Sequence, residues 1–206
     1  LMGDYFDRTL AAAQDYCATA GAHFLSPFDD EDVIEGQASV AVEILEQIDG
    51  IPDLVILPVG GGGLSAGITS FFAEAAPSTR FLYVEPAGGA SLTAALAAGG
   101  PVTLKRVNNF VDGAAVARIG ARTFDRLKQV HPEQVLLAPE DRVCITMLEM
   151  LNVEGIVLEP AGALSVAGLK SYVEKNACKN KNFVAITCGA NMNFDRLRFV
   201  AERAEV

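Results

Sequence analysis

The stretch that most constrains the fold is residues 53–67, DLVILPVGGGGLSAG. Its apolar run, residues 54–59, has the length and composition of a strand that is buried on both faces. A helical pattern begins directly after the glycines, at Leu64. The strand and this helix are joined by four consecutive glycines, Gly60, Gly61, Gly62 and Gly63.

This glycine run predicts an anion site. Glycine loses more backbone entropy on folding than any other residue, so four in a row are unfavourable unless the backbone must approach something closely. Backbone N–H groups in such a loop, together with the positive end of the following helix, favour a bound phosphate. A tight strand-to-helix turn without a ligand is the plain alternative, but one glycine would suffice for it.

A dinucleotide site is a second alternative for the same loop. No Lys-Ser or Lys-Thr follows the glycines, which excludes a Walker-type loop. The loop does contain Gly61-x-Gly63-x-x-Ala66, a degenerate form of the nicotinamide-cofactor motif. Glu85 lies near the end of the next expected strand, where a ribose-binding acid would lie. The motif alone leaves this interpretation open.

Composition excludes several classes of function. The formal net charge is −10 and no basic cluster stands out, which argues against a nucleic-acid partner. No apolar run reaches the length of a membrane span. The cysteines and histidines show no paired metal-ligand spacing, so we expect reduced thiols and no metal site. They are Cys17, Cys144, Cys178, Cys188, His23 and His131.

Strand and helix patterns alternate along almost the whole chain. This alternation predicts an α/β domain with a mostly parallel sheet and helices on both faces. The expected strands are residues 23–25, 54–59, 81–84, 135–137 and 183–187. The expected helices are residues 5–19 with an Asp4 cap, a helix after Gly36-Gln37, 64–76, 91–98, 118–128, 139–151, one after Glu159-Pro160 and one capped by Asp195.

The functional segments are expected where strands end. Ligands of such sheets bind at the carboxyl ends of the strands. Three segments qualify by position: residues 60–64, the turn after Glu85, and residues 188–191. Residues 28–32, FDDED, are expected to form a polar turn whose four carboxylates cap helices, because no further metal ligands lie near them in sequence.

Several motifs together resemble a known enzyme family. The chain contains, in order, PFDDEDVIEGQ, PVGGGGLSAG, VEPAGGASL, VDGAAVARIG, EPAGALSVAGLKSY and TCGANMNFDRLRFVAERAE. Over essentially its whole length it resembles the later part of the catalytic domain of the pyridoxal-phosphate-dependent serine and threonine dehydratases, and the threonine dehydratases (threonine ammonia-lyases) among them. The resemblance implies fold type II, the tryptophan synthase β-like fold, here incomplete at the N-terminus.

The resemblance also implies a set of residues that bind pyridoxal 5′-phosphate. The Cys188 side chain would face the pyridine nitrogen, and Gly113 would lie beside the ring. A neutral thiol there leaves the ring a weaker electron sink than a carboxylate would, which suits prompt loss of a β-hydroxyl. No metal site is implied, because Gly89 and Ser91 stand where racemases place ligands after the residue matching Glu85. The phosphate would be held by the backbone N–H groups of Gly60, Gly61, Gly62, Gly63 and Leu64.

The implied activity is the dehydrative deamination of L-threonine, with L-serine as a further candidate substrate, to a 2-oxo acid (2-oxobutanoate from threonine) and ammonia. Its implied setting is isoleucine biosynthesis in the cytoplasm, or in a plastid for a plant or alga. Serine dehydration or racemisation within the same family stays open. Relatives form homo-oligomers, which we expect here.

One expected part of the site is missing from the sequence. The family forms its Schiff base through a lysine in a Ser-x-Lys-x-Arg-Gly-Ala type of motif, and no lysine here has that context. In relatives the motif lies upstream. The start, LMGDYFD, resembles neither a signal peptide nor a natural start. We therefore expect residues 1–206 to be the C-terminal portion of a catalytic domain, inactive alone, with no regulatory domain.

Overall fold

A four-stranded parallel sheet forms the centre of the computed structural model, which describes residues 6–193 and 195–204. The strand order is β3-β2-β1-β4, so the first two strands of the chain lie in the middle. In register, Ile56 of β1 lies between Leu82 of β2 and Ala185 of β4. The strands are β1 (Leu54–Pro58), β2 (Arg80–Pro86), β3 (Val135–Ala138) and β4 (Phe183–Ala185).

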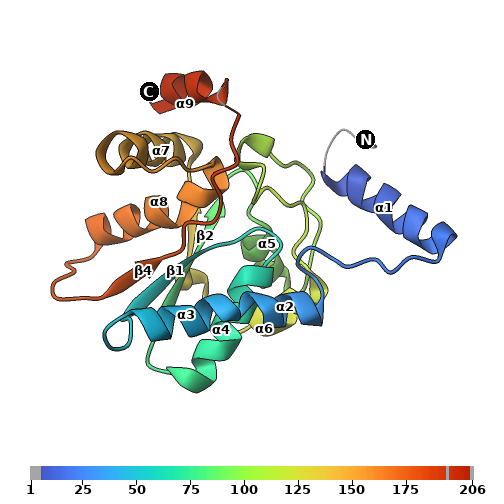
Figure 1. Ribbon diagram of the computed structural model, residues 1–206, viewed down its shortest axis with the longest axis horizontal. Coiled ribbons are helices and arrows are strands. Elements are labelled where there is room, and N and C mark those ends of the chain that lie inside the picture. The colour runs from blue at the N-terminus through green and yellow to red at the C-terminus, as the bar shows by residue number, and fades with distance from the viewer. Residues whose placement is uncertain (1–5, 194, 205–206) are drawn as a thin grey trace.

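Helices cover both faces of this sheet (Figure 1). The helix α8 packs with α7 and α9 on one face, and α2, α3, α4 and α6 lie on the other. The α-helices are α1 (Phe6–Ala20), α2 (Glu31–Gln37), α3 (Ser39–Gln47), α4 (Gly63–Ala75), α5 (Ser91–Ala98), α6 (Ala121–Leu127), α7 (Glu140–Glu154), α8 (Pro160–Lys175) and α9 (Arg196–Ala204). Two short 3-10 turns, Asn109–Val111 and Pro132–Gln134, complete the described elements.

The central strand β1 explains the two-layer core. All of its five residues are buried, as expected for a parallel strand that is covered on both faces. Alternate side chains enter different clusters: Leu54 and Ile56 pack towards α7 and α8, whereas Val55 and Leu57 pack towards α3 and α4. The α/β class with a parallel sheet and helices on both faces is therefore confirmed.

Two expectations about the first part of the chain are wrong. Residues 23–25 form no strand, because this segment pairs with no strand of the described chain and has no regular secondary structure. The acidic segment does not stay a turn, because α2 begins at Glu31. Its capping role is confirmed, since the Asp30 carboxylate accepts from the Asp32 N–H group at 3.0 Å. The expected Asp4 cap lies outside the described residues.

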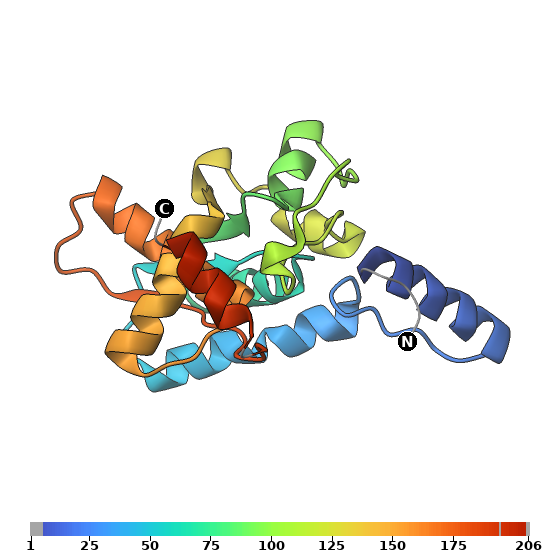
Figure 2. The same cartoon turned by 90° about the horizontal axis from the view of Figure 1, so that it is seen from above.

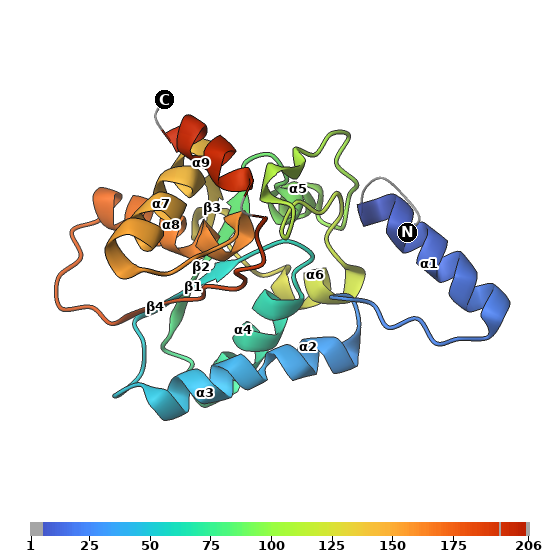
Figure 3. The same cartoon turned by 45° about the horizontal axis from the view of Figure 1, so that its top comes forward.

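Helix α1 stands apart from the rest of the molecule in all three views (Figures 1, 2 and 3). None of its residues 8–20 is buried, and the apolar residues Leu10, Ala13 and Cys17 are only half-buried. Elsewhere the element boundaries differ from expectation by a few residues; α6, for example, begins at Ala121 instead of Arg118. Over the described residues we find no helix with the length and hydropathy that crossing a bilayer requires.

Candidate functional site

The residues expected at the site line one pocket of about 380 Å³ at the carboxyl edge of the sheet. The pocket lies where the neighbouring strands β1 and β4 end, and the helices that follow them, α4 and α9, pack on opposite faces of the sheet. Chains leave such a pair of strands in opposite directions and open a crevice, which is the usual ligand position in open α/β sheets. The expected residues in its lining are Gly60, Gly61, Gly62, Gly63, Leu64, Gly113 and Cys188.

The glycine loop offers a row of free backbone donors. Within the described chain, the N–H groups of residues 60–64 donate to no carbonyl oxygen; the first such bond of α4 is from Ala66 to Gly62. Gly62 has φ +92°, a left-handed conformation that L side chains rarely adopt. Since unpaired buried donors are costly, the loop is built to receive an acceptor at the N-terminus of α4.

A second helix fixes the orientation of this loop. The Gly61 carbonyl accepts from Thr123 Oγ1 at 2.8 Å and from the Gly120 N–H group at 3.3 Å, at the start of α6. The Asp29 carboxylate caps α6 by accepting three backbone N–H groups at 3.0, 2.7 and 3.3 Å, from Ala121, Arg122 and Thr123. Because the Gly61 carbonyl points towards α6, the N–H groups of the glycine loop point away from α6.

Phe28 packs against the glycine loop and was not anticipated from the sequence. A Cβ atom at Gly61 would lie only 2.2 Å from Phe28 Cγ, so the ring and the loop are in close contact. Phe28 also lines the pocket. Phe28 belongs to the motif PFDDEDVIEGQ, but nothing in that motif shows that its ring contacts the glycine loop, because the contact forms only in the folded chain. Other pocket residues that were missed are Pro27, Gln37, Pro58, Ala114, Val116 and Ala161.

Cys188 lines the same pocket from the turn after β4. Its side chain is half-buried. Burial raises the pKa of the Cys188 thiol, and the negative charge of Glu159 raises it further. The thiol is therefore held in its neutral S–H form at neutral pH and can act as a weak hydrogen-bond donor.

Glu85 is not available to a ligand. Its carboxylate is fully buried and accepts from the Leu92 and Thr93 N–H groups at 2.6 and 2.9 Å, and from Thr93 Oγ1 at 2.6 Å. Burial raises the pKa of this carboxyl, and the three donors oppose that rise. Glu85 therefore caps α5. The nicotinamide interpretation loses the ribose contact on which it depended.

A comparison with known protein families shows which family this chain belongs to. The profile of the family described as "Pyridoxal-phosphate dependent enzyme" matches residues 1–189. The chain belongs to this family of pyridoxal-phosphate dependent enzymes. The expected cofactor is thereby confirmed at the level of the family.

Two relatives found by sequence carry the name of the same reaction. The chain is 44% identical over 204 residues to the biosynthetic L-threonine dehydratase of Bacillus subtilis, covering 99% of this chain and 48% of that protein. It is 41% identical to the chloroplastic biosynthetic threonine dehydratase of Arabidopsis thaliana, covering 100% of this chain and 35% of the relative. The chain thus spans about half the length of the bacterial relative and a third of the plant one.

Solved structures show the same fold. The processed form of threonine deaminase isoform 2 from Solanum lycopersicum superposes with a TM-score of 0.93 at 38% identity, covering 99% of this chain and 59% of that one. A serine racemase from maize superposes with a TM-score of 0.84 at 25% identity, covering 98% of this chain and 63% of the other. The expected type II fold is confirmed.

The pocket fits the family's cofactor. Its volume lies within the range of small-molecule sites. The row of free N–H groups suits a phosphate, and the neutral thiol across the pocket suits an uncharged ring nitrogen. In the described part of the chain no lysine lines the pocket, and no group of three histidine, cysteine or acidic residues could hold a metal ion.

Proposed function

We propose that the protein containing this chain catalyses the dehydrative deamination of L-threonine to 2-oxobutanoate and ammonia, with pyridoxal 5′-phosphate as its cofactor. The observation that carries the proposal is one pocket that combines five consecutive free N–H groups with a neutral thiol. The relatives named as threonine dehydratases in Bacillus subtilis and Arabidopsis thaliana support the choice of substrate.

Each side of the pocket has a proposed role. Gly60, Gly61, Gly62, Gly63 and Leu64 bind the phosphate through their backbone N–H groups. Cys188 donates its S–H to the pyridine nitrogen without protonating it fully, and Gly113 allows the ring to lie close to the backbone. When bound, the cofactor supplies electron withdrawal from the α-carbon of the amino acid, so that a β-hydroxyl can leave.

The base of the reaction is proposed to come from outside this chain. No lysine among the described residues lines the pocket, and the relatives are about two to three times as long as the matched segment. We assign residues 1–206 to the C-terminal portion of a catalytic domain whose other portion supplies the Schiff-base lysine. We further propose a homo-oligomer that works in isoleucine biosynthesis, in the cytoplasm or, in a plant or alga, in a plastid.

Borohydride reduction of the protein as isolated from its source, followed by peptide mapping, tests this proposal. We expect a pyridoxyl-lysine on a peptide outside residues 1–206, and 2-oxobutanoate on addition of L-threonine. A modified lysine within residues 1–206 would show that the base was assigned wrongly. The absence of any adduct, with no 2-oxobutanoate formed, would refute the proposed function. Faster turnover of L-serine than of L-threonine would favour the serine-specific alternative.

A further inference from the structure

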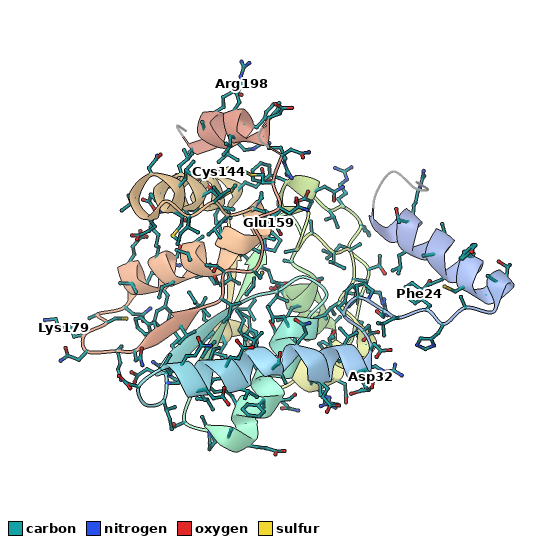
Figure 4. The ribbon with its side chains drawn as sticks, viewed as in Figure 1. Phe24, Asp32, Cys144, Glu159, Lys179 and Arg198 are labelled. Carbon is teal, nitrogen blue, oxygen red and sulfur yellow. The ribbon has the colours of Figure 1, made fainter. Side chains whose placement is uncertain are left out.

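The turn that carries Cys188 is held by one acidic side chain behind the pocket wall. The Glu159 N–H group donates to the Gly189 carbonyl at 3.1 Å, and the Asn191 N–H group donates to Glu159 Oε2 at 3.2 Å. Glu159 thus contacts the turn through both its backbone and its side chain, on either side of Ala190. In Figure 4, Glu159 lies at the N-terminal end of α8, beside the segment that leads from β4 to α9.

The carboxylate occupies a space that two glycines leave for it. A Cβ atom at Gly189 would lie 2.4 Å from Glu159 Oε1, and one at Gly113 would lie 3.0 Å from the same oxygen. Gly113 lines the pocket, as does Cys188, which precedes Gly189. Glu159 therefore lies directly behind two walls of the pocket.

Glu159 does not perform the usual task of an acid at its position. It is the N-cap residue of α8, where a carboxylate ordinarily accepts from the first turn of its own helix. Here its side chain makes no capping hydrogen bond and points instead towards the 188–191 turn. Helix capping therefore does not account for the orientation of the Glu159 side chain, whereas contact with the 188–191 turn does.

We propose that Glu159 is a positioning residue for Cys188, because its carboxylate anchors the turn that presents the thiol to the pyridine-nitrogen side of the pocket. The role of the thiol towards the pyridine nitrogen rests on the proposed function, whereas the contact between Glu159 and the 188–191 turn does not. The charge of Glu159 serves the same end, because a nearby anion disfavours the thiolate. Asp112, the acid that lines the pocket, is paired with Arg196 Nη1 at 2.8 Å, which leaves Glu159, behind the wall, as the unpaired charge near Cys188 in the described chain.

Two substitutions separate the charge of Glu159 from its hydrogen bond. Glu159→Gln removes the charge but keeps an oxygen that can accept from Asn191, whereas Glu159→Ala removes both. Glu154→Gln is the matched control, because Glu154 is an exposed acid in the last turn of α7. The readouts are the rate of iodoacetamide alkylation at Cys188 as a function of pH, followed on its peptide by mass spectrometry, and hydrogen-exchange protection of the Asn191 amide.

In Glu159→Gln we expect alkylation of Cys188 at pH 7.5 to be faster by about threefold or more, because loss of the nearby negative charge lowers the pKa of the thiol. Protection of the Asn191 amide should be retained. In Glu159→Ala that protection should fall about tenfold or more. Glu154→Gln should match the wild type in both readouts, and urea unfolding of each variant verifies that it is folded.

An unchanged pH profile in Glu159→Gln, or unchanged Asn191 protection in Glu159→Ala, would overturn the proposal. A separate arm tests the cofactor: 4-deoxypyridoxine 5′-phosphate, which has no aldehyde, should slow alkylation of wild-type Cys188. Absence of that protection, with the Glu159 effects intact, would count against the proposed function while leaving the positioning of Cys188 by Glu159 established.

Discussion

At the scale of single residues, the site depends on glycines that make room for particular neighbours. Gly61 leaves room for the Phe28 ring, Gly189 leaves room for the Glu159 carboxylate, and Gly162 lets the first turn of α8 approach the Gly189 carbonyl, which a Cβ atom would meet at 2.3 Å. These glycines bring backbone close to a ring, a charge and another backbone. Substituting them therefore tests contacts and not only chain flexibility.

Gly61→Ala should destabilise the protein by about 1–3 kcal/mol, as overpacking typically does. The added methyl group would meet the Phe28 ring at Cγ, near the backbone of Phe28, where the side chain cannot swing away easily. Urea unfolding measures the change. Gly100→Ala is the control, since nothing lies within 4 Å of a Cβ atom there. Equal stability of the two variants would show that the contact with Phe28 is not tight in solution.

Replacement of the Cys188 thiol should change the ratio between exchange of the substrate's α-proton and formation of 2-oxobutanoate. In Cys188→Asp we expect turnover of L-threonine to fall about tenfold or more, because a carboxylate keeps the pyridine nitrogen protonated and stabilises excess charge on the ring. In deuterium oxide, exchange of the α-proton into recovered threonine should rise relative to formation of 2-oxobutanoate. Cys188→Ser, which keeps a neutral donor, should stay near wild type in both quantities.

At the scale of elements, the sequence predicts the parts that have a local signal. The β1–glycine loop–α4 unit was placed to within a residue or two, because a buried apolar strand, a glycine run and a helical period mark it. Residues 23–25 also have the local pattern of a strand, but they find no partner strand. Strand pairing depends on distant segments, so a local pattern cannot predict it. The site shows the same division: sequence patterns pointed to the glycine loop and Cys188, which line one pocket, whereas the contacts of Phe28 and Glu159 with these segments form only across the fold.

The Asp29 cap of α6 links an acidic turn to the glycine loop. Asp29→Ala should lower the free energy of unfolding by about 1–2 kcal/mol, since three N–H groups at the start of α6 lose their acceptor. Asp49→Ala, at an exposed loop position, is the control and should have little effect. Because Thr123 of α6 also holds the Gly61 carbonyl, affinity for 4-deoxypyridoxine 5′-phosphate should fall in Asp29→Ala. Unchanged stability would mean that water replaces the cap without cost.

The buried cap of α5 should make stability depend on pH. Burial raises the pKa of Glu85 above its ordinary 4.5. The folded state then binds the proton more tightly than the unfolded state, so this residue's contribution to stability falls as the pH rises above about 4.5. In Glu85→Gln that part of the pH dependence should be absent from urea unfolding curves, although the variant itself is less stable. Parallel pH profiles of the two proteins would contradict this assignment.

At the scale of the whole molecule, two regions differ in how firmly they are held. The sheet and its covering helices share a buried core, whereas α1 lies apart and has no buried residue at positions 8–20. Regions with few buried apolar contacts open at low free energy. We expect amides of α1 to exchange with solvent within seconds to minutes, well before those of β1, in hydrogen-exchange mass spectrometry of the protein. Protection of α1 equal to that of β1 would show that another surface covers it.

The strand order β3-β2-β1-β4 has a consequence for how this protein matures. The glycine loop belongs to the first βαβ unit, whereas the Cys188 turn follows the last and shortest strand, which joins β1 from near the other end of the chain. Contacts of such long sequence separation are slow to form. A cofactor that touches both loops would hold this late-forming edge in place, and it would stabilise the native state by an amount that grows with the free cofactor concentration relative to its dissociation constant. Vitamin B6 supply would then govern how much of the protein reaches its mature form, as well as how fast it works.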